Sequence, residues 1–281
     1  MTYRELWQQL TQLYDEGEAK AIARMVYEVR YGLSLSDIYI GKDTQLSADN
    51  QAELEEIAKR LAEGEPVQYV LGQVDFAGHT FLVTPQVLIP RPETAELVEW
   101  VSLTANRQRP ITQMLDIGTG SGCIAISLAA RFPQASVTAW DISAEALAVA
   151  RENAKRTRVH VSFEQVDILH LTSFHQTAGA FDLIVSNPPY ICNKEREDME
   201  RNVLHYEPHR ALFVPDDNPL LFYRAIADYA QTALTSGGWL YFEMNPLYAG
   251  ELKELLGRMS YHDIELSTDQ FGKQRFMRAQ R

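Results

Sequence analysis

Cysteine is scarce in this chain, and what the cysteines lack excludes several kinds of site. The 281 residues contain two, Cys123 and Cys192, which lie far apart and outside any CxxC pair or zinc-ligand spacing. We therefore expect two reduced thiols and no bound metal. The sequence has no run of about 18 apolar residues and no signal-peptide segment at its N-terminus, so we expect a cytoplasmic protein without a membrane partner.

Positive charge is also in short supply. Lys and Arg number 26 against 38 Asp and Glu, which gives a formal net charge of −12. Proteins that hold duplex nucleic acid along its backbone usually carry a basic surface, so we expect no direct nucleic-acid binding, although a local basic patch would be compatible with an acidic total. Hydrophobic residues make up 46% of the chain, enough for a packed core in one large domain or two modest ones.

The first part of the chain has the apolar spacing of helices. Three segments show it, at residues 6–14, 22–29 and 54–61, and Ser47 is a suitable N-cap before the third. Gly64 and Pro66 then break the pattern. We predict a helical bundle over residues 1–72 that serves packing or the docking of a substrate.

The spacing changes at residue 73. Apolar and polar residues alternate on either side of Ala77-Gly78, which predicts a β-hairpin linker over residues 73–87 and a second domain over residues 88–281. Strands and helices alternate in that domain. Expected strands are residues 114–117, 137–140, 159–163, 181–185 and 239–244, and expected helices are residues 95–101, 123–131, 144–155 and 220–234.

This alternation predicts an α/β, Rossmann-like domain with a mostly parallel sheet covered on both faces. Residues 261–277 resemble two further strands joined by a turn near Gly272, and we expect them to close the sheet as an antiparallel pair.

A glycine-rich turn follows the first strand of this sheet and opens a helix. Its candidate cofactor-binding residues are Gly118, Thr119, Gly120, Ser121 and Gly122. Glycine lets the backbone turn sharply and approach a ligand, and ligands of such sheets bind at the carboxyl ends of the strands. Cys123 stands where the dinucleotide fingerprint requires glycine, which favours S-adenosylmethionine over a nicotinamide cofactor.

Two acidic residues end the next strands. Asp141 could accept hydrogen bonds from both hydroxyls of a ribose, or could only cap the helix that follows. Asp167 could contact the adenine amine, or could be an ordinary turn carboxylate. Both positions belong to the expected cofactor site.

The segment Ser186-Asn187-Pro188-Pro189-Tyr190 follows the strand expected to be buried at residues 181–185, and it indicates the chemistry. An amide or aromatic amine nitrogen is a poor nucleophile because its lone pair is delocalised. The side-chain carbonyl of Asn187 and the backbone carbonyl of Pro188 could accept its two N–H bonds, which would aim the lone pair and stabilise the developing positive charge. Pro189 stiffens the turn, and Tyr190 offers a flat face for a planar group. We predict methyl transfer to such a nitrogen, with Asn187, Pro188 and Tyr190 as catalytic residues.

Five blocks spread over nearly the whole chain form a specific combination. They are residues 64–72 (GEPVQYVLG), 88–94 (LIPRPET), 115–122 (LDIGTGSG), 186–190 (SNPPY) and 207–212 (EPHRAL). The chain thereby resembles the HemK/PrmC family, the release factor glutamine methyltransferases. The NPPY block alone is shared with methyltransferases that act on adenine in DNA.

The resemblance implies S-adenosylmethionine as cofactor and, as substrate, the glutamine of a Gly-Gly-Gln motif in peptide chain release factors. It implies cofactor contacts from the glycine turn, Asp141, Ile168 and Asn187, substrate binding at residues 187–190, and docking of the release factor by the helical bundle. The chain departs from relatives at Ile168, where they often have an aromatic residue, at residues 213–219, where a Gly-rich stretch is common, and at Asn245, where glycine is frequent.

Several interpretations stay open. Arg91 and Glu93 could bind substrate beside residues 187–190 or form a structural ion pair, and residues 194–201 could be a solvated face or a lid. The rival functions are a nucleic-acid amino-methyltransferase, which would need to flip out a base, a methyltransferase for a ribosomal-protein glutamine, a binding module without activity and a nicotinamide oxidoreductase.

Overall fold

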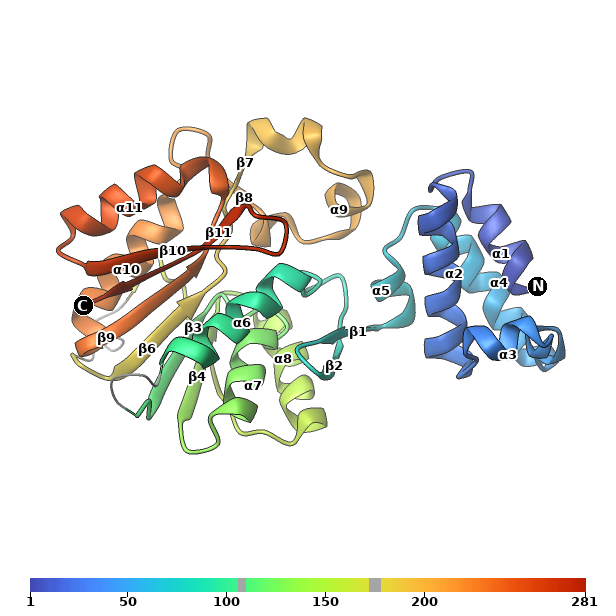
Figure 1. Cartoon of the computed structure of the whole chain (residues 1–281), viewed down its shortest axis with the longest axis horizontal. Coiled ribbons are helices and arrows are strands. Elements are labelled where there is room, and N and C mark those ends of the chain that lie inside the picture. Colours follow the sequence, from blue (N-terminus) through green and yellow to red (C-terminus); the bar gives the residue numbers. More distant parts are fainter. Residues whose placement is uncertain (106–109, 172–177) are drawn as a thin grey trace. The chain divides into compact units, whose positions relative to one another are not determined.

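The computed structural model describes residues 1–105, 110–171 and 178–281. The chain divides into two compact units. Residues Met1–Gln73 and Met199–Tyr206 form a helical unit, and residues Val74–Asp198 and Glu207–Arg281 form an α/β unit (Figure 1).

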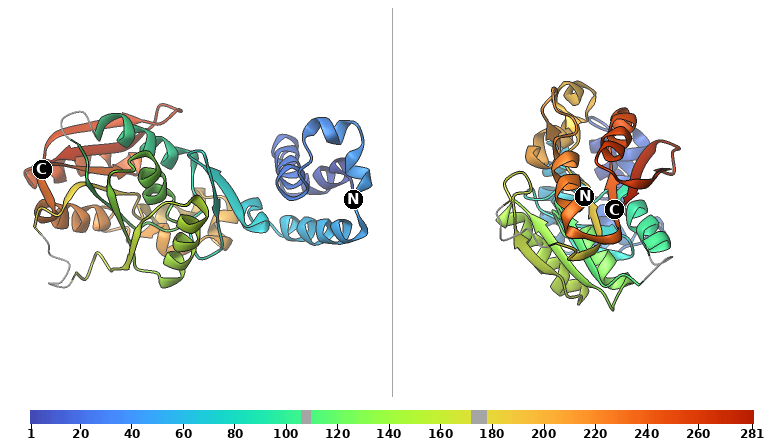
Figure 2. Two further views of the ribbon diagram at one scale, coloured as in Figure 1. Left: turned by 90° about the horizontal axis from the view of Figure 1, so that it is seen from below. Right: turned by 90° about the vertical axis from the view of Figure 1, so that its left-hand side faces the viewer.

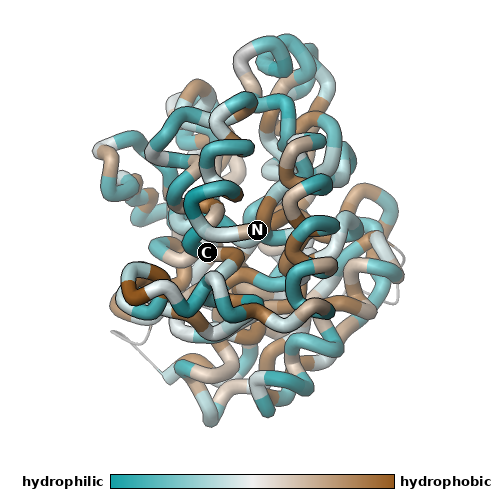
Figure 3. Tube along the Cα trace, turned by 90° about the vertical axis from the view of Figure 1, so that its right-hand side faces the viewer, coloured by the Kyte–Doolittle hydropathy of each residue, from teal (hydrophilic) through white to brown (hydrophobic). Residues whose placement is uncertain are grey.

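The helical unit packs around one apolar core that includes Leu6, Val26, Tyr27 and Leu61. Figure 3 shows hydrophobic and hydrophilic residues interleaved along its helices, as expected when each helix buries one face. The Ser47 hydroxyl accepts from the Asn50 backbone N–H at 3.2 Å, so the predicted N-cap is confirmed. The helices are α1 (Tyr3–Leu10), α2 (Glu16–Tyr31), α3 (Leu35–Tyr39), η1 (Lys42–Gln45), α4 (Ala48–Ala62), α5 (Val67–Leu71) and α9 (Arg201–Tyr206).

The predicted hairpin is present as β1 (Gln73–Phe76) and β2 (His79–Leu82). Its turn residues Ala77 and Gly78 have φ angles of 49° and 86°, the pair of left-handed residues that the tightest hairpin turns require. Phe76 and Phe81 pack edge to face, with ring centroids 5.7 Å apart, inside the core of the α/β unit. The hairpin is therefore part of that unit's core.

The α/β unit is built on a seven-stranded sheet of order β10-β11-β9-β6-β3-β4-β5. Strands β5, β4, β3, β6 and β9 run parallel, whereas β11 pairs antiparallel with β9 and β10. The predicted Rossmann-like sheet with antiparallel C-terminal strands is confirmed. The strands are β3 (Gln113–Ile117), β4 (Ser136–Asp141), β5 (Ser162–Gln165), β6 (Phe181–Ser186), β9 (Leu234–Glu243), β10 (His262–Thr268) and β11 (Gln274–Gln280).

Two strand starts differ from prediction by more than one residue. The strand expected from residue 159 begins at Ser162, because Val159 follows the end of a helix and its N–H bonds to the Ala154 carbonyl. The strand expected from residue 239 begins at Leu234, which was expected to end the preceding helix, and it runs through Gly237.

Helices cover both faces of the sheet (Figure 1 and Figure 2). Successive strand residues point to opposite sides, so Tyr241 joins the core under α6, α7 and α8 while Leu240 joins the core under α10 and α11. These helices are α6 (Pro92–Thr104), α7 (Cys123–Arg131), α8 (Ala144–Thr157), α10 (Leu221–Ala233) and α11 (Ala249–Arg258). The remaining short elements are β7 (Ile191–Cys192), β8 (Phe213–Val214), η4 (Asn193–Asp198), η5 (His209–Ala211) and η6 (Pro246–Tyr248).

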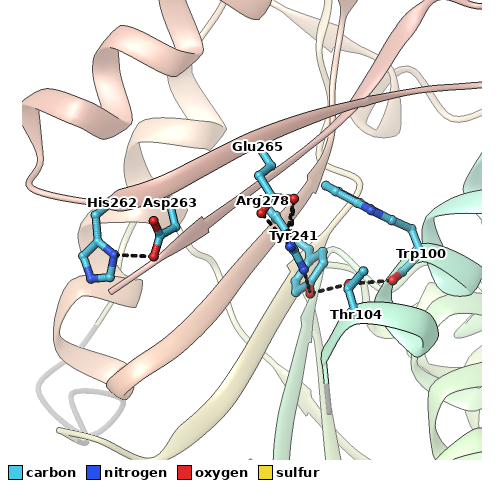
Figure 4. Close-up of polar contacts among 7 residues, drawn as sticks. All are labelled: Trp100, Thr104, Tyr241, His262, Asp263, Glu265 and Arg278. Carbon is cyan, nitrogen blue, oxygen red and sulfur yellow. Dashed lines mark hydrogen bonds and ion pairs between the residues drawn. The ribbon is translucent and has the colours of Figure 1, made fainter. Parts of the chain in front are cut away.

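A chain of hydrogen bonds ties the last turn of α6 to the sheet (Figure 4). The Arg278 guanidinium donates to the Tyr241 hydroxyl at 3.4 Å, and the Tyr241 and Thr104 hydroxyls are 2.8 Å apart. Thr104 donates in turn to the Trp100 carbonyl at 2.6 Å. Arg278 is also held by Glu265 at 2.7 Å, so each member of this chain is satisfied within the fold.

Within the three described ranges, no group of three or more His, Cys, Asp or Glu side chains is arranged to hold a metal ion. The same residues include no helix long and apolar enough to cross a membrane. Cys123 and Cys192 are both buried free thiols.

Candidate active site

Strand register brings the predicted site segments to one edge of the sheet. Ile117 at the end of β3 pairs with Trp140 on β4 and with Ser186 on β6, and the Ser186 hydroxyl donates to the Ile117 carbonyl at 2.6 Å. Ser186 is in turn level with Phe242 on β9. The residues that follow these positions, among them Gly118, Asp141 and Asn187, therefore emerge side by side.

A cavity of about 340 Å³ lies at this edge, between the glycine turn and the Asn-Pro-Pro-Tyr turn. The predicted residues that line it are Gly118, Gly120, Asp141, Asp167, Ile168, Asn187, Pro188 and Pro189. Other predicted residues lie outside its lining: Thr119, Ser121, Gly122, Tyr190, Arg91 and Glu93. Sequence reasoning missed several lining residues, among them Gln86, Val87, Phe222 and Ile226, because no chemical pattern marks these residues.

Three glycines of the turn have positive φ, but they serve two purposes. Gly118 and Gly120, at 76° and 55°, line the cavity, and a Cβ atom on either would meet no atom within 4 Å. Gly122 has φ of 82°, and a Cβ there would lie 3.1 Å from the Ala150 Cβ of α8. The first two therefore expose backbone to the cavity, while Gly122 permits close packing of the turn on a helix.

Asp116, which was not among the predicted site residues, stabilises the glycine turn by hydrogen bonds. Its Oδ2 accepts from the Thr119 hydroxyl at 2.6 Å and from the Ala125 backbone N–H at 3.2 Å. Its Oδ1 is buried and has no hydrogen-bond partner among the described residues. Burial raises the pKa of this carboxyl to about 7, although the two hydrogen bonds oppose the shift.

Asp141 connects the glycine turn to the following helix. Its Oδ2 accepts from the Gly120 backbone N–H at 2.8 Å, and its Oδ1 accepts from that of Ser143 at 2.9 Å. Burial raises its pKa, and these N–H groups oppose the shift. Each carboxylate oxygen has a second lone pair, so Asp141 can brace the turn and still accept hydrogen bonds from a ligand in the cavity.

Asp167 has a more local role than Asp141. Its oxygens accept from the Leu169 backbone N–H at 2.9 Å and pair with the His170 ring at 2.8 Å, so the carboxylate orders its own turn. The neighbouring Ile168 contributes to the lining of the cavity, together with Ile142 and Leu169. This region offers apolar side chains on which a flat ring could pack.

Asn187 belongs to a hydrogen-bonded network that includes two residues absent from the predicted site. Its side-chain Nδ2 donates to the Thr94 hydroxyl at 3.1 Å, and Thr94 donates to Glu243 Oε2 at 2.7 Å. The Tyr190 hydroxyl donates to the other oxygen of Glu243 at 3.1 Å. Glu243 was recognisable in principle, because it ends an apolar strand as Asp141 does, and Thr94 closes the 88–94 block.

Burial raises the pKa of Glu243, while the hydrogen bonds from Thr94 and Tyr190 and the charge of Arg275 oppose the shift. Burial also raises the pKa of the Tyr190 hydroxyl, so it stays protonated and acts as the donor. The backbone carbonyl of Tyr190 accepts from Asn245 at 3.2 Å. Asn245 has φ of −69°, a conformation that does not require the glycine frequent in relatives.

Arg91 forms an ion pair with the buried carboxylate of Glu207, which also accepts from the Ile89 backbone N–H at 3.1 Å. The pair fixes the Pro-rich loop that leads into α6, which fits the structural alternative for Arg91. Glu195, in the segment expected to be a solvated face or a lid, accepts from the Cys192 backbone N–H at 2.7 Å and from Asn245.

The cavity fits S-adenosylmethionine by the chemistry of its lining. The open backbone at Gly118 and Gly120 would suit the amino-acid portion of the cofactor, the Asp141 carboxylate would suit a ribose, and the apolar side chains near Ile168 would suit an adenine ring.

A Rossmann-like sheet that places a glycine turn and an Asn-Pro-Pro-Tyr turn in one cavity defines an S-adenosylmethionine-dependent methyltransferase. The comparisons with known proteins agree: residues 98–210 match the methyltransferase small domain family, and residues 3–72 match the PrmC N-terminal domain family. The chain belongs to the release factor glutamine methyltransferases.

Two relatives with that name show how far the likeness extends. The protein from Bacteroides thetaiotaomicron is 46% identical over 274 residues, covering 98% of this chain and 97% of the relative. The protein from Flavobacterium psychrophilum is 41% identical, covering 96% and 95%. Among solved structures, the hMettl16 catalytic domain has a TM-score of 0.56 at 15% identity, covering 71% of this chain and 74% of that one, which shows a shared fold.

Proposed function

We propose that the protein transfers a methyl group from S-adenosylmethionine to the side-chain amide nitrogen of the glutamine in the Gly-Gly-Gln motif of peptide chain release factors. Its membership in the family supports this substrate. The observation that carries the proposal is the state of Asn187: its amide nitrogen is engaged by Thr94, so its oxygen remains an acceptor beside a cavity that also contains Gly118 and Gly120.

The proposed roles follow from hydrogen-bonding capacity. When bound, S-adenosylmethionine supplies a methyl group on a positively charged sulfur, so the N–CH3 bond forms as the S–CH3 bond breaks, with S-adenosylhomocysteine and one proton from the nitrogen as the other products. Asn187 Oδ1 and the backbone carbonyl of Pro188 accept the two N–H bonds of the substrate amide, which stops its rotation and aims the nitrogen lone pair. The same two oxygens stabilise positive charge as it develops on that nitrogen. Pro189 keeps the turn rigid, and the Tyr190 ring supports the plane of the amide.

We assign cofactor contacts to Gly118, Gly120, Asp141 and Ile168. We assign support of the glycine turn to Thr119, to Gly122 and to Ser121, whose carbonyl accepts from the Asn153 side chain at 2.9 Å. Asp167 orders the turn that precedes the adenine region. Glu93, in the first turn of α6 beside Thr94, remains a candidate for contact with the substrate.

We propose that the helical unit, residues 1–72, docks the release factor, that residues 73–87 link it to the catalytic domain, and that residues 88–281 carry out the transfer. The formal charge of −12 supports a protein rather than a nucleic acid as the partner. The reduced, buried state of both cysteines is compatible with a place in the cytoplasm.

A competition experiment tests this function. The purified protein is incubated with methyl-labelled S-adenosylmethionine and an equimolar mixture of a release factor, ribosomal proteins, DNA and RNA. We expect label on the release factor alone, and tandem mass spectrometry should place one methyl group on the glutamine of its Gly-Gly-Gln motif. A release factor with that glutamine replaced by glutamate serves as the matched control. Label on a nucleic acid or a ribosomal protein would overturn the proposal.

A further inference from the structure

The network behind Asn187 contains a buried carboxylate with no role in the chemistry described so far. Glu243 is 2% exposed and lies at the end of β9, where Thr94 and Tyr190 donate to its two oxygens. It does not line the cavity. Its direct contacts toward the site are therefore its two hydrogen-bond partners, Thr94 and Tyr190.

With Glu243 ionised, the donors and acceptors of this network can be arranged in one way. An ionised carboxylate accepts hydrogen bonds and cannot donate them, so Thr94 must spend its single hydroxyl proton on Glu243. Toward Asn187, the Thr94 oxygen is then an acceptor only. It can pair with the Asn187 NH2 group at 3.1 Å but not with its carbonyl oxygen.

The two ends of an asparagine amide have nearly the same shape, so packing alone selects poorly between the two orientations. If the amide were inverted, its N–H groups would face the N–H groups of the substrate, two donors would oppose each other, and one of the two proposed acceptors would be lost.

We propose that Glu243 and Thr94 are positioning residues that hold the Asn187 amide with its oxygen toward the substrate nitrogen. Glu243 also holds the Tyr190 hydroxyl, so one carboxylate orients both side chains on which the substrate amide would rest. This inference depends on the proposed function for the identity of the substrate but not for the orientation of Asn187.

The test compares two threonines of the same helix. Thr94→Val removes the hydroxyl that links Asn187 to Glu243 and keeps the volume of the side chain. Thr104→Val makes the same change at the other end of α6, where Thr104 bonds to Tyr241 of the same strand β9. Thr94→Ser keeps the hydroxyl and serves as the rescue variant.

With a release factor as substrate, we expect Thr94→Val to lower kcat roughly 10- to 100-fold, because a misplaced reacting group typically costs this much. The Kd for S-adenosylmethionine should stay unchanged, since Thr94 does not line the cavity. Thr94→Ser should restore most of the rate, and Thr104→Val should leave kcat unchanged at a comparable loss of thermal stability. A wild-type rate for Thr94→Val, or an equal loss of rate for Thr104→Val, would overturn the inference.

Nuclear magnetic resonance separates this inference from the proposed function, because it needs no substrate. The side-chain NH2 resonances of Asn187, assigned by their disappearance in Asn187→Ala, should shift in the full-length Thr94→Val protein and not in Thr104→Val. If the wild-type protein fails to methylate any release factor but these resonances shift as expected, the function is wrong and the orientation stands. If they do not shift, the orientation is wrong whatever the substrate.

Discussion

Helix α6 presents a threonine to β9 near each of its ends, and the two hydrogen-bonded chains differ in how they finish. At the C-terminal end, the chain runs from Arg278 through Tyr241 and Thr104 to the Trp100 carbonyl. Each donor there meets an acceptor of the protein.

At the N-terminal end, the chain runs from Asn187 through Thr94 to Glu243. It leaves one strong acceptor, Asn187 Oδ1, without a hydrogen bond from any residue that the structure describes, and this acceptor belongs to a residue that lines the cavity. We call a hydrogen-bonded chain closed when each of its donors and acceptors is paired within the protein, and open when it leaves an acceptor unpaired at the cavity. We infer that the closed chain stabilises the fold, whereas the open chain positions a group for binding.

The change with the largest expected effect removes the open acceptor itself. Asn187→Ala should lower kcat at least about 10²–10³-fold, the usual cost of deleting one charge-stabilising group from an active site. Circular dichroism and thermal melting should show an intact fold. Single-turnover methylation of a release factor measures the effect, and full activity would remove Asn187 from the catalytic residues.

Each of the two hydrogen-bonded chains can be broken by a substitution on β9, at Glu243 in one and at Tyr241 in the other. Glu243→Gln replaces an acceptor-only group by one that must also donate, so it should lower kcat roughly 10- to 100-fold. Tyr241→Phe breaks the closed chain and should cost about 1–3 kcal/mol of unfolding free energy without changing kcat. Steady-state kinetics and urea denaturation of both variants decide the matter. If Tyr241→Phe lowers kcat as strongly as Glu243→Gln, the distinction between open and closed chains is wrong.

Asp141 adds a third case to the comparison, because it is hydrogen-bonded within the protein and also lines the cavity. Both of its oxygens accept backbone hydrogen bonds, as in the closed chain, yet it lines the cavity. Asp141→Ala should weaken binding of S-adenosylmethionine by on the order of 1.5–3 kcal/mol for each charge-assisted hydrogen bond lost. Isothermal titration calorimetry measures the Kd, with Asp167→Ala as the comparison variant of smaller expected effect. An unchanged affinity would place the ribose elsewhere.

Asp116 also has an oxygen without a hydrogen bond from any described residue, but it does not line the cavity. We therefore expect Asp116 to affect stability. Its pKa is raised from 3.8 to about 7, mainly by burial. A group whose folded-state pKa is raised contributes stability that is present at low pH and lost as pH rises toward that pKa. Between these two pKa values, the unfolding free energy of the wild type should fall relative to Asp116→Asn by on the order of 1.4 kcal/mol per pH unit.

Denaturant titrations of both proteins at several pH values test this prediction. Groups common to the two proteins cancel in the difference between their unfolding free energies. A difference that stays constant from pH 4 to pH 7 would show that Asp116 does not titrate as its burial requires.

Local patterns carried most of what the sequence predicts about the fold. Helix α8 begins at Ala144 as expected, and β6 is buried throughout, as a strand covered on both faces must be. Helix α11 was missed because glycines at 250 and 257 interrupt a short segment, and α3 and α5 have five residues each, too few to show a period.

In the site, too, local patterns were predictable from the sequence and long-range contacts were not. The glycine turn and the Asn-Pro-Pro-Tyr turn are contiguous, and their chemistry can be inferred from neighbouring residues. The partnership of Thr94 with Glu243 spans 149 positions, and it exists only because α6 packs on the face of the sheet toward which Glu243 points. No local pattern contains such a contact.

The two turns leave β3 and β6, which are neighbours with Ile117 opposite Ser186. Adjacent strands of any sheet lie about 4.8 Å apart, a separation fixed by backbone hydrogen bonds and independent of side chains. Backbone hydrogen bonds thus fix the distance between the glycine turn, which would hold the methyl donor, and the Asn-Pro-Pro-Tyr turn, which would hold the methyl acceptor. Substitutions in the turns can change which molecules they bind. A change in the distance between the two turns would require a different register of β3 and β6.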